Sequence, residues 1–292
     1  MTDGSVFRSE PADPAEGGGL VRVRIDLAYD GTEFSGWARQ LGRRTVEAVL
    51  DDALAKVLGL AEAPALTVAG RTDAGVHAGG QVAHIDLPEA AVTDLGMLMR
   101  RLAGVLPDDV VVRDIRAAPD GFDARFAALG RHYGYRVTDA VPDPLRRRDT
   151  LAWPRPLDVE AMNRAAAQLE GEHDFAAYCR PRAGATTIRT LRQLHAVRGA
   201  DGVVTISAHA DAFCHNQVRS MVGALLAVGD GRRPVEWPGE LLAAKVRAST
   251  VTVAPAHGLT LVGVDYPPAE GLSDRVAQTR QRRDGRPVQA RS

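Results

Sequence analysis

The sequence predicts an α+β fold made of two ferredoxin-like halves. Residues 21–115 show the order strand, helix, strand, strand, helix, strand, which is the split βαβ pattern. A looser copy of this element order follows between residues 131 and 266. The two stretches share no sequence repeat, so only their order of elements relates them. Together they account for most of the chain.

Each element of the first half has its own signal. Val21, Val23, Ile25 and Leu27 alternate with other residues, as in a half-buried strand. Thr45 is a suitable N-cap for a helix, because an apolar face continues from there to Leu58. The remaining predicted elements are strands at 65–69 and 81–87, a helix from 89 to 103, and a strand from 110 to 115.

The second half is predicted from similar patterns, with Asp158 as the N-cap of its first helix. The predicted strands are 131–138, 187–197, 203–210 and 259–266, and the later helices are 215–229 and 238–247. These boundaries divide the chain into a disordered extension (1–20), two domains (21–118 and 119–267) and a disordered basic tail (268–292).

Composition limits the possible function without deciding it. The formal net charge of −1 is not the basic balance typical of nucleic-acid-binding proteins, although local arginine pairs such as Arg125 with Arg131 could still form a patch. No apolar run of about 18 residues is present, and no signal peptide is expected. Cys179 and Cys214 lack a CxxC spacing, which favours a reducing cytoplasm without a structural disulfide or zinc.

Residues 69–78 form the most informative segment, Ala-Gly-Arg-Thr-Asp-Ala-Gly-Val-His-Ala. The segment connects two predicted strands, and its glycines permit a tight turn and a close approach of the main chain to a ligand. Arg71, Thr72, Asp73 and His77 provide a cation, a hydroxyl, a carboxylate and an imidazole. Charged residues on a loop held between strands indicate a functional site.

Five segments in order resemble motifs of the TruA family of tRNA pseudouridine synthases. They cover about residues 21 to 267 and are 29–37 (Tyr-Asp-Gly-Thr-Glu-Phe-Ser-Gly-Trp), 70–77 (Gly-Arg-Thr-Asp-Ala-Gly-Val-His), 122–135 (with Arg131-His132-Tyr133), 213–223 (with Val218-Arg219-Ser220) and 254–261 (Ala-Pro-Ala-His-Gly-Leu-Thr-Leu). One departure is Ala38, since family members often have Trp-Gln-Arg-Gln where this chain has Trp-Ala-Arg-Gln.

The resemblance implies specific residue roles. It makes Asp73 the catalytic carboxylate, Arg219 its ion-pair partner and Tyr133 the aromatic group that stacks on uracil. Arg71 would fill the space left by a flipped base. The remaining candidate substrate contacts are Thr72, His77, Gln81, Arg39, Gln40, Arg125 and Arg131.

The resemblance also implies a reaction and an assembly. Uridine at tRNA positions 38, 39 and 40 would be isomerised to pseudouridine without a cofactor or metal, because neither redox chemistry nor group transfer from outside is required. Whether Asp73 acts as nucleophile or base stays open. The two halves would join their sheets around a central catalytic cleft, with helices on one face and the cleft on the other, in a cytoplasmic homodimer that binds tRNA.

Two other interpretations are possible. Asp73, His77 and His84 could be the ligands of a metal-dependent hydrolase, although this spacing is a weak signal. Alternatively, tandem ferredoxin-like domains could bind RNA without catalysis, through an open sheet face that carries aromatic side chains. A carboxylate motif at the centre of such a face would repel phosphate.

Overall fold

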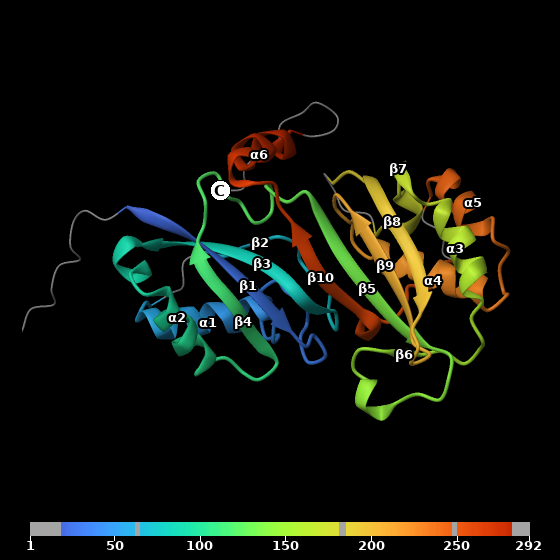
Figure 1. The fold of residues 1–292 in the computed structure, drawn as a ribbon, viewed down its shortest axis with the longest axis horizontal. Helices are drawn as coiled ribbons and strands as arrows, with labels where there is room; N and C mark the ends of the chain where they lie inside the picture. The colour runs from blue at the N-terminus through green and yellow to red at the C-terminus, as the bar shows by residue number, and fades with distance from the viewer. Residues whose placement is uncertain (1–18, 62–64, 181–184, 247–249, 282–292) are drawn as a thin grey trace, which may run out of the picture.

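The computed structural model describes residues 19–61, 65–180, 185–246 and 250–281. Within these ranges, ten strands form one sheet, whose main path runs in the order β4-β1-β3-β10-β5-β9-β8-β7 (Figure 1). The two short strands β2 and β6 pair with β3 and β5 beside this path. The described part of the chain contains no helix that is long and apolar enough to cross a membrane.

The first half has the ferredoxin-like order β4-β1-β3-β2. Thr45 caps α1 by accepting a hydrogen bond from the Ala48 amide, as its position predicts. The expected helix from 89 to 103 is divided into a 3-10 turn at Glu89–Val92 and α2, because Asp94 caps a new helix start. The elements are β1 (Leu20–Tyr29), α1 (Val46–Leu58), β2 (Thr67–Val68), β3 (His77–Pro88), α2 (Leu95–Ala103) and β4 (Val110–Ala117).

The second half repeats this order as β10-β5-β9-β8. Asp158 caps its first helix by accepting from the Ala161 amide at 2.9 Å, again as predicted. The elements are β5 (Gly130–Thr138), β6 (Leu151–Ala152), α3 (Val159–Ala167), β7 (Gly171–Asp174), β8 (Ile188–Arg198), β9 (Val204–Ala210), α4 (Gln217–Gly229), α5 (Trp237–Ala244) and β10 (Leu259–Asp265). The predicted α+β class with two ferredoxin-like halves and a joined, mainly antiparallel sheet is therefore confirmed.

The two halves join where β3 runs parallel to β10. The pairing is short, with Thr260 opposite His77 and Leu261 opposite Ala78. Gly80 permits this close approach, because a Cβ atom at that position would lie 2.2 Å from the carbonyl oxygen of Val262. Since β3 begins at His77 rather than at residue 81, the connection that carries Asp73 is shorter than the sequence suggested.

The helices of both halves pack on the same face of the sheet. One core joins α1 and α2 to β1 and β3, and another joins α3, α4 and α5 to β5, β8 and β9. Leu261 of β10 belongs to the first core, and it pairs with Tyr133, which packs against both cores. The centre of the joined sheet is thus the place where the two cores meet.

The prediction that residues 268–292 form a disordered tail is wrong for residues 272–280, which form a helix. Leu272–Arg280 form α6, whose Leu272 is buried in a third core beside Phe122 and Ala124. Arg275 of this helix donates to the Ala128 carbonyl oxygen. The rest of the predicted tail from 282 on, and most of the predicted N-terminal extension (1–18), lie outside the described residues.

Replacement of Leu272 tests the assignment of α6 to the folded body. Leu272→Ala should lower the free energy of unfolding by about 2–4 kcal/mol, because a buried leucine leaves a cavity. Leu145→Ala is the control, since Leu145 is 87 % exposed, and it should change stability by less than about 0.5 kcal/mol. Equal denaturation midpoints for the two variants would contradict the packing of α6.

His84 should make the protein less stable in acid. Burial, followed by the nearby charge of Arg22, lowers the pKa of His84, and its Nδ1 accepts a hydrogen bond from the Ala124 amide at 2.9 Å. Below about pH 6.5 the unfolded chain binds a proton that the native state resists. Stability should therefore fall as the pH decreases through 6.5, at a cost of about 1.4 kcal/mol for each unit of lowered pKa.

Urea denaturation between pH 7.5 and 5 measures this effect. His84→Asn preserves an acceptor for the Ala124 amide without the titrating ring, so its stability should depend less on pH. His195→Asn replaces an exposed histidine and serves as the control. An unchanged pH dependence in His84→Asn would show that another group is responsible.

Candidate active site

The loop between β2 and β3 is held against the segment that follows β1. The Trp37 amide donates to the Thr72 carbonyl oxygen at 3.0 Å, and the Gly75 amide donates to that of Phe34 at 3.2 Å. Gly75 has φ +76°, in the left-handed region that favours glycine. Gly36, at φ +96°, lies so close that a Cβ atom would be 2.8 Å from the Thr72 oxygen. These contacts fix the main chain on both sides of Asp73.

A buried polar network of Tyr29, Thr72 and Gln81 stabilises this loop. The Tyr29 hydroxyl lies 2.7 Å from Thr72 Oγ1, and Gln81 Nε2 donates to the Gly70 carbonyl oxygen at 2.8 Å and to Tyr29 at 3.2 Å. Burial raises the pKa of Tyr29 to about 12, so the phenol stays protonated. Thr72 and Gln81 were expected to contact substrate, but both are buried and bound to protein groups.

His77 connects the two halves. Its Nδ1 accepts from the Gly31 amide at 2.9 Å, so Nε2 carries the proton and faces the carbonyl oxygens of Arg148 and His257 at 2.7 and 3.0 Å. Asp30 Oδ1 lies 3.1 Å from Nδ1. Because the ring is buried and both nitrogens are engaged, the geometry favours a supporting role for His77 over a contact with RNA.

The structure brings Asp73 and Arg219 together across the junction. Arg219 Nη1 lies 3.8 Å from Asp73 Oδ2, and Arg219 Nε donates to the Ala254 carbonyl oxygen at 2.7 Å. His215 Nε2 lies 3.4 Å from the other carboxylate oxygen, Oδ1. The Arg219 side chain is 19 % exposed and that of Asp73 32 %. A partly open carboxylate therefore faces two groups from the start of α4 and the segment before it.

Tyr133 lies at the same junction. It pairs with Leu261 in β10 and Ala208 in β9, and its ring packs edge-on against Phe213 with centroids 5.3 Å apart. Burial, with smaller effects from Tyr29 and Asp73, raises the pKa of Tyr133 far above its usual value. The side chain is therefore a neutral phenol at physiological pH.

This arrangement corrects the expected position of the cleft. Tyr133 points to the sheet face that the helices cover, because it packs with both helix-containing cores. Arg219 lies on α4 itself. Asp73, Arg219 and Tyr133 thus meet between the two groups of helices, and not on the opposite face.

Two of the arginines predicted to contact substrate already bind groups of the protein. Arg131 donates to the carbonyl oxygens of Ala69, Asp211 and Arg125, and burial lowers its pKa. Arg39 pairs with two carboxylates of α1, those of Asp51 and Asp52.

The other predicted contacts lie nearer the surface. Gln40 is exposed and donates to the Ser35 carbonyl oxygen. Arg125 lies over the ring of Phe126. Arg71, two residues before Asp73, is exposed, and no hydrogen bond or ion pair links it to another described residue.

The ligand set expected for a metal-dependent hydrolase is not assembled. His77 and His84 each accept a backbone amide, from Gly31 and Ala124, and His84 is buried against the ring of Phe122. Asp73 instead faces Arg219 and His215.

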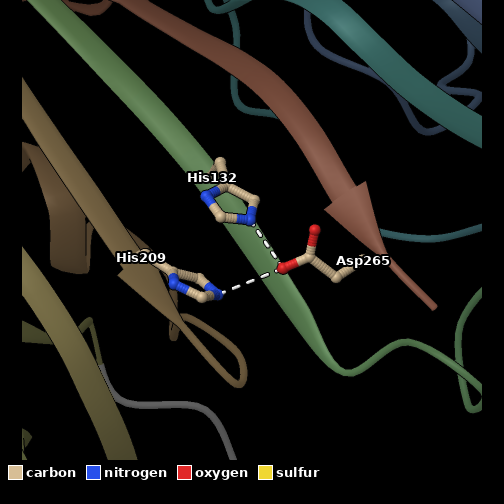
Figure 2. Close-up of side chains that lie close together, drawn as sticks. All are labelled: His132, His209 and Asp265. Carbon is tan, nitrogen blue, oxygen red and sulfur yellow. Dashed lines mark hydrogen bonds and ion pairs between the residues drawn. The ribbon is translucent and has the colours of Figure 1, made fainter. Parts of the chain in front are cut away.

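Another group, on the opposite sheet face, contains His132, His209 and Asp265 (Figure 2). Asp265 Oδ2 lies 2.6 Å from His132 Nε2 and 3.3 Å from His209 Nε2. Arg192 Nη1 lies 3.2 Å from the same His209 nitrogen. Arg192 thus engages a histidine nitrogen that a metal would need, and the group fits an ion-pair network better than a metal site.

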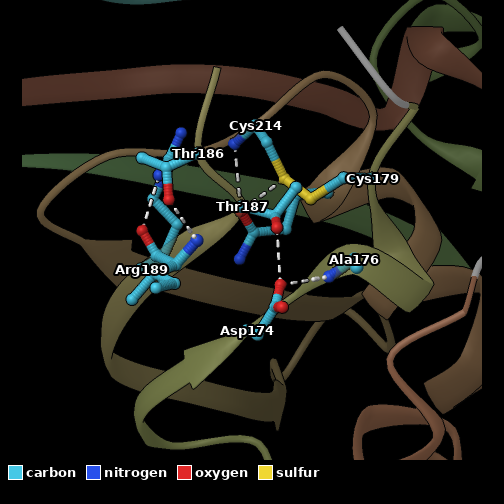
Figure 3. The surroundings of a disulfide bond; sticks show 9 residues. Asp174, Ala176, Cys179, Thr186, Thr187, Arg189 and Cys214 are labelled. Carbon is cyan, nitrogen blue, oxygen red and sulfur yellow. Dashed lines mark hydrogen bonds between the residues drawn. A yellow bond between two sulfur atoms is a disulfide. The ribbon is translucent and has the colours of Figure 1, made fainter. Parts of the chain in front are cut away.

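The expected absence of a disulfide is wrong in this structure. Cys179 and Cys214 form a disulfide with Cα atoms 5.7 Å apart (Figure 3). The separation of 35 residues gives no local signal for this pairing. Cys214 lies between Phe213, which contacts Tyr133, and His215, which contacts Asp73.

Comparison with known proteins identifies the family. A family model described as tRNA pseudouridine synthase matches residues 165–267. A protein from Frankia casuarinae named tRNA pseudouridine synthase A is 61 % identical over 264 residues, which cover 90 % of this chain and 95 % of the relative. The chain belongs to the tRNA pseudouridine synthase A family.

Further relatives agree with this membership. Proteins of the same name from Streptomyces avermitilis and Mycobacterium leprae are 58 % and 51 % identical, covering 91 % and 90 % of this chain and 95 % and 96 % of the relatives. A chain in a solved Cbf5-Nop10-Gar1 complex has a TM-score of 0.34 at 13 % identity, covering 71 % of this chain and 45 % of that one. That likeness is too weak to carry an argument.

Sequence reasoning missed three residues of the site. His215 and Phe213 lie inside the motif that contains Arg219, but neither spacing nor periodicity distinguishes them from their neighbours. Tyr29 stands in the first motif, where alternation in β1 indicates only a core position. Their contacts with Asp73, Tyr133 and Thr72 depend on the long-range fold.

The network below the loop can be tested by Tyr29→Phe. Thr72 and Gln81 would lose a buried partner, at a cost of about 1–3 kcal/mol in stability. Amide hydrogen exchange in residues 70–76 should become faster. Tyr178→Phe removes a hydrogen bond to Pro238 in the other core and is the matched control, which should leave the loop unchanged. Equal loop protection in both variants would contradict the supporting role of Tyr29.

Proposed function

We propose that this protein is an isomerase that converts uridine in tRNA to pseudouridine, with Asp73 as the catalytic carboxylate. The observation that carries the proposal is the position of Asp73, partly open at the junction and opposite Arg219. Membership of the tRNA pseudouridine synthase A family supports the substrate and the reaction. The runner-up, a non-catalytic RNA-binding module, gives no reason for such a carboxylate.

The reaction must break the N1–C1′ bond, turn the base and join it through C5. Asp73 can attack the sugar or accept a proton from it, and either role requires an ionised carboxylate in a fixed place. Arg219 supplies the opposite charge, and its bond to Ala254 holds the guanidinium in that direction. These two residues therefore act as one unit.

Tyr133 provides a surface for the base. Its neutral phenol can stack on uracil and place its hydroxyl near C5, where the proton must leave. The target base has to leave its stack before it reaches this ring, at a cost of a few kcal/mol. The flipped base leaves an empty space in the stack, and we assign Arg71, an exposed cation two residues before Asp73, to fill it.

Buried and paired candidates take other roles in this proposal. Arg131, through Ala69, and Gln81, through Gly70, hold the chain before Asp73. Three further candidates, Arg39, Gln40 and Arg125, lie near enough to the surface to contact phosphate. For Arg39, a phosphate would replace the two carboxylates with which it pairs. Family likeness supports tRNA positions 38, 39 and 40 as targets and a homodimer in the cytoplasm.

Tritium release from tRNA transcripts that carry 5-³H-uridine tests the activity. Wild type should release tritium from anticodon-arm uridines, and Asp73→Asn should lower the single-turnover rate by at least about a hundredfold with tRNA affinity largely kept. Asp120→Asn, at an exposed carboxylate in another loop, is the matched control and should keep the wild-type rate. Clear product from Asp73→Asn would rule out the assigned role.

Transcripts with a single uridine at position 38, 39 or 40 define the target. Release from uridines elsewhere in the tRNA would contradict the proposed positions without affecting the chemistry. Bound tRNA without any release, by folded wild-type protein, would favour the RNA-binding module.

A further inference from the structure

We propose that Cys179 and Cys214 form a reversible redox site, whose oxidation by a small-molecule disulfide slows the enzyme by locking the segment that touches Asp73 and Tyr133. The expected effect on turnover rests on the proposed function, whereas the formation of the disulfide does not depend on it.

The first observation is the position of Cys214 in the chain. Its neighbours Phe213 and His215 contact Tyr133 and Asp73, at 5.3 Å between ring centroids and 3.4 Å between Nε2 and Oδ1. These three consecutive residues lie in the connection between β9 and α4. A covalent bond at Cys214 therefore acts on both site contacts at once.

The second observation is the position of Cys179, the other cysteine of the disulfide. Cys179 is 1 % exposed and follows a 3-10 turn at Ala176–Tyr178, whose Ala177 and Tyr178 are buried in the second core. The next residue, Arg180, donates its amide to the His215 carbonyl oxygen at 2.9 Å. Oxidation thus ties the segment with Phe213 and His215 to a part of the core that cannot move easily.

The third observation is a hydrogen-bond partner for Cys214 in its reduced form. Gln217 Oε1 lies 3.2 Å from Cys214 Sγ and accepts from the Cys214 amide at 3.0 Å. After reduction, the Cys214 thiol can donate to the same oxygen. The Cys214 thiol of the reduced form therefore has a hydrogen-bond acceptor already in place.

The chemistry is a thiol–disulfide exchange. Cys214 is only partly buried, so its thiolate can attack one sulfur of a small-molecule disulfide and release the first small thiol. The Cys179 thiolate then attacks the Cys214 sulfur and releases the second. Two electrons pass to the small disulfide, and the two thiol protons are carried away by the two released thiols. An excess of small thiol reverses both steps.

The direction of the effect follows from the contact with Tyr133. Phe213 packs edge-on against Tyr133, so a uracil ring that stacks on the Phe213 side of Tyr133 requires Phe213 to move. Phe213 can yield when Cys214 is tethered only by hydrogen bonds, and it is restrained when the disulfide is closed. The reduced enzyme should therefore be the faster form, in agreement with a reducing cytoplasm, where protein disulfides are mostly transient.

The test compares one wild-type preparation in two states. Protein is treated with oxidised glutathione or with dithiothreitol, thiols are counted by titration, and tritium release is measured under single-turnover conditions. The oxidised form should be slower by roughly tenfold to a hundredfold, the scale expected when groups at a catalytic site are displaced by about 1 Å. Dithiothreitol should restore the rate fully.

Cys179→Ala is the matched variant, because it removes the bond without changing a residue at the site. Without treatment it should have the rate of reduced wild type. Oxidised glutathione should convert it only to a mixed disulfide at Cys214, detected as an added mass, because no Cys179 thiol remains to release the second glutathione. Two free thiols in treated wild type, or equal or faster turnover by the disulfide form, would overturn the proposal. Loss of turnover in the reduced form as well would instead contradict the proposed function.

Discussion

The parallel pairing of β3 with β10 determines where the candidate site lies. Only Thr260 and Leu261 take part from β10, yet this contact joins two ferredoxin-like units into one sheet. It also places the loop before β3 opposite the start of α4, where Arg219 faces Asp73. His77, the first residue of β3, adds hydrogen bonds to backbone groups from both halves. The position of the carboxylate thus depends on the junction, and the buried groups beneath the loop preserve it.

Much of the fold could be predicted from the sequence because its main elements carry strong local patterns. Alternation in β1 and the capped helices that follow Thr45 and Asp158 are set by nearby residues. The polar helix α6 was missed because, of its nine residues, only Leu272 is buried, which leaves no apolar period. Short β6 and β7 exist through pairing with β5 and β8, so they have no independent signal.

For the candidate site too, the sequence could predict some features and not others. Motif likeness predicted Asp73 and Arg219 as an ion pair, and the structure places their side chains 3.8 Å apart. The chemical roles of these two residues and of Tyr133 stay predictions. Motif likeness could not separate a residue that faces substrate from one that supports the loop, as with Gln81, because both occur in the same motif. The contact of His215 with Asp73 was likewise hidden, since it depends on the packing of α4.

Chemical rescue of Arg219→Ala tests the central claim most directly, namely that Asp73 works through the cation opposite it. The variant should release tritium at least about a hundredfold more slowly than wild type, the scale seen when one electrostatic group is removed from an active site. Added guanidinium ions should restore part of that rate, and they should not restore activity to Asp73→Asn. An Arg219→Ala enzyme as fast as wild type, without guanidinium, would contradict the account.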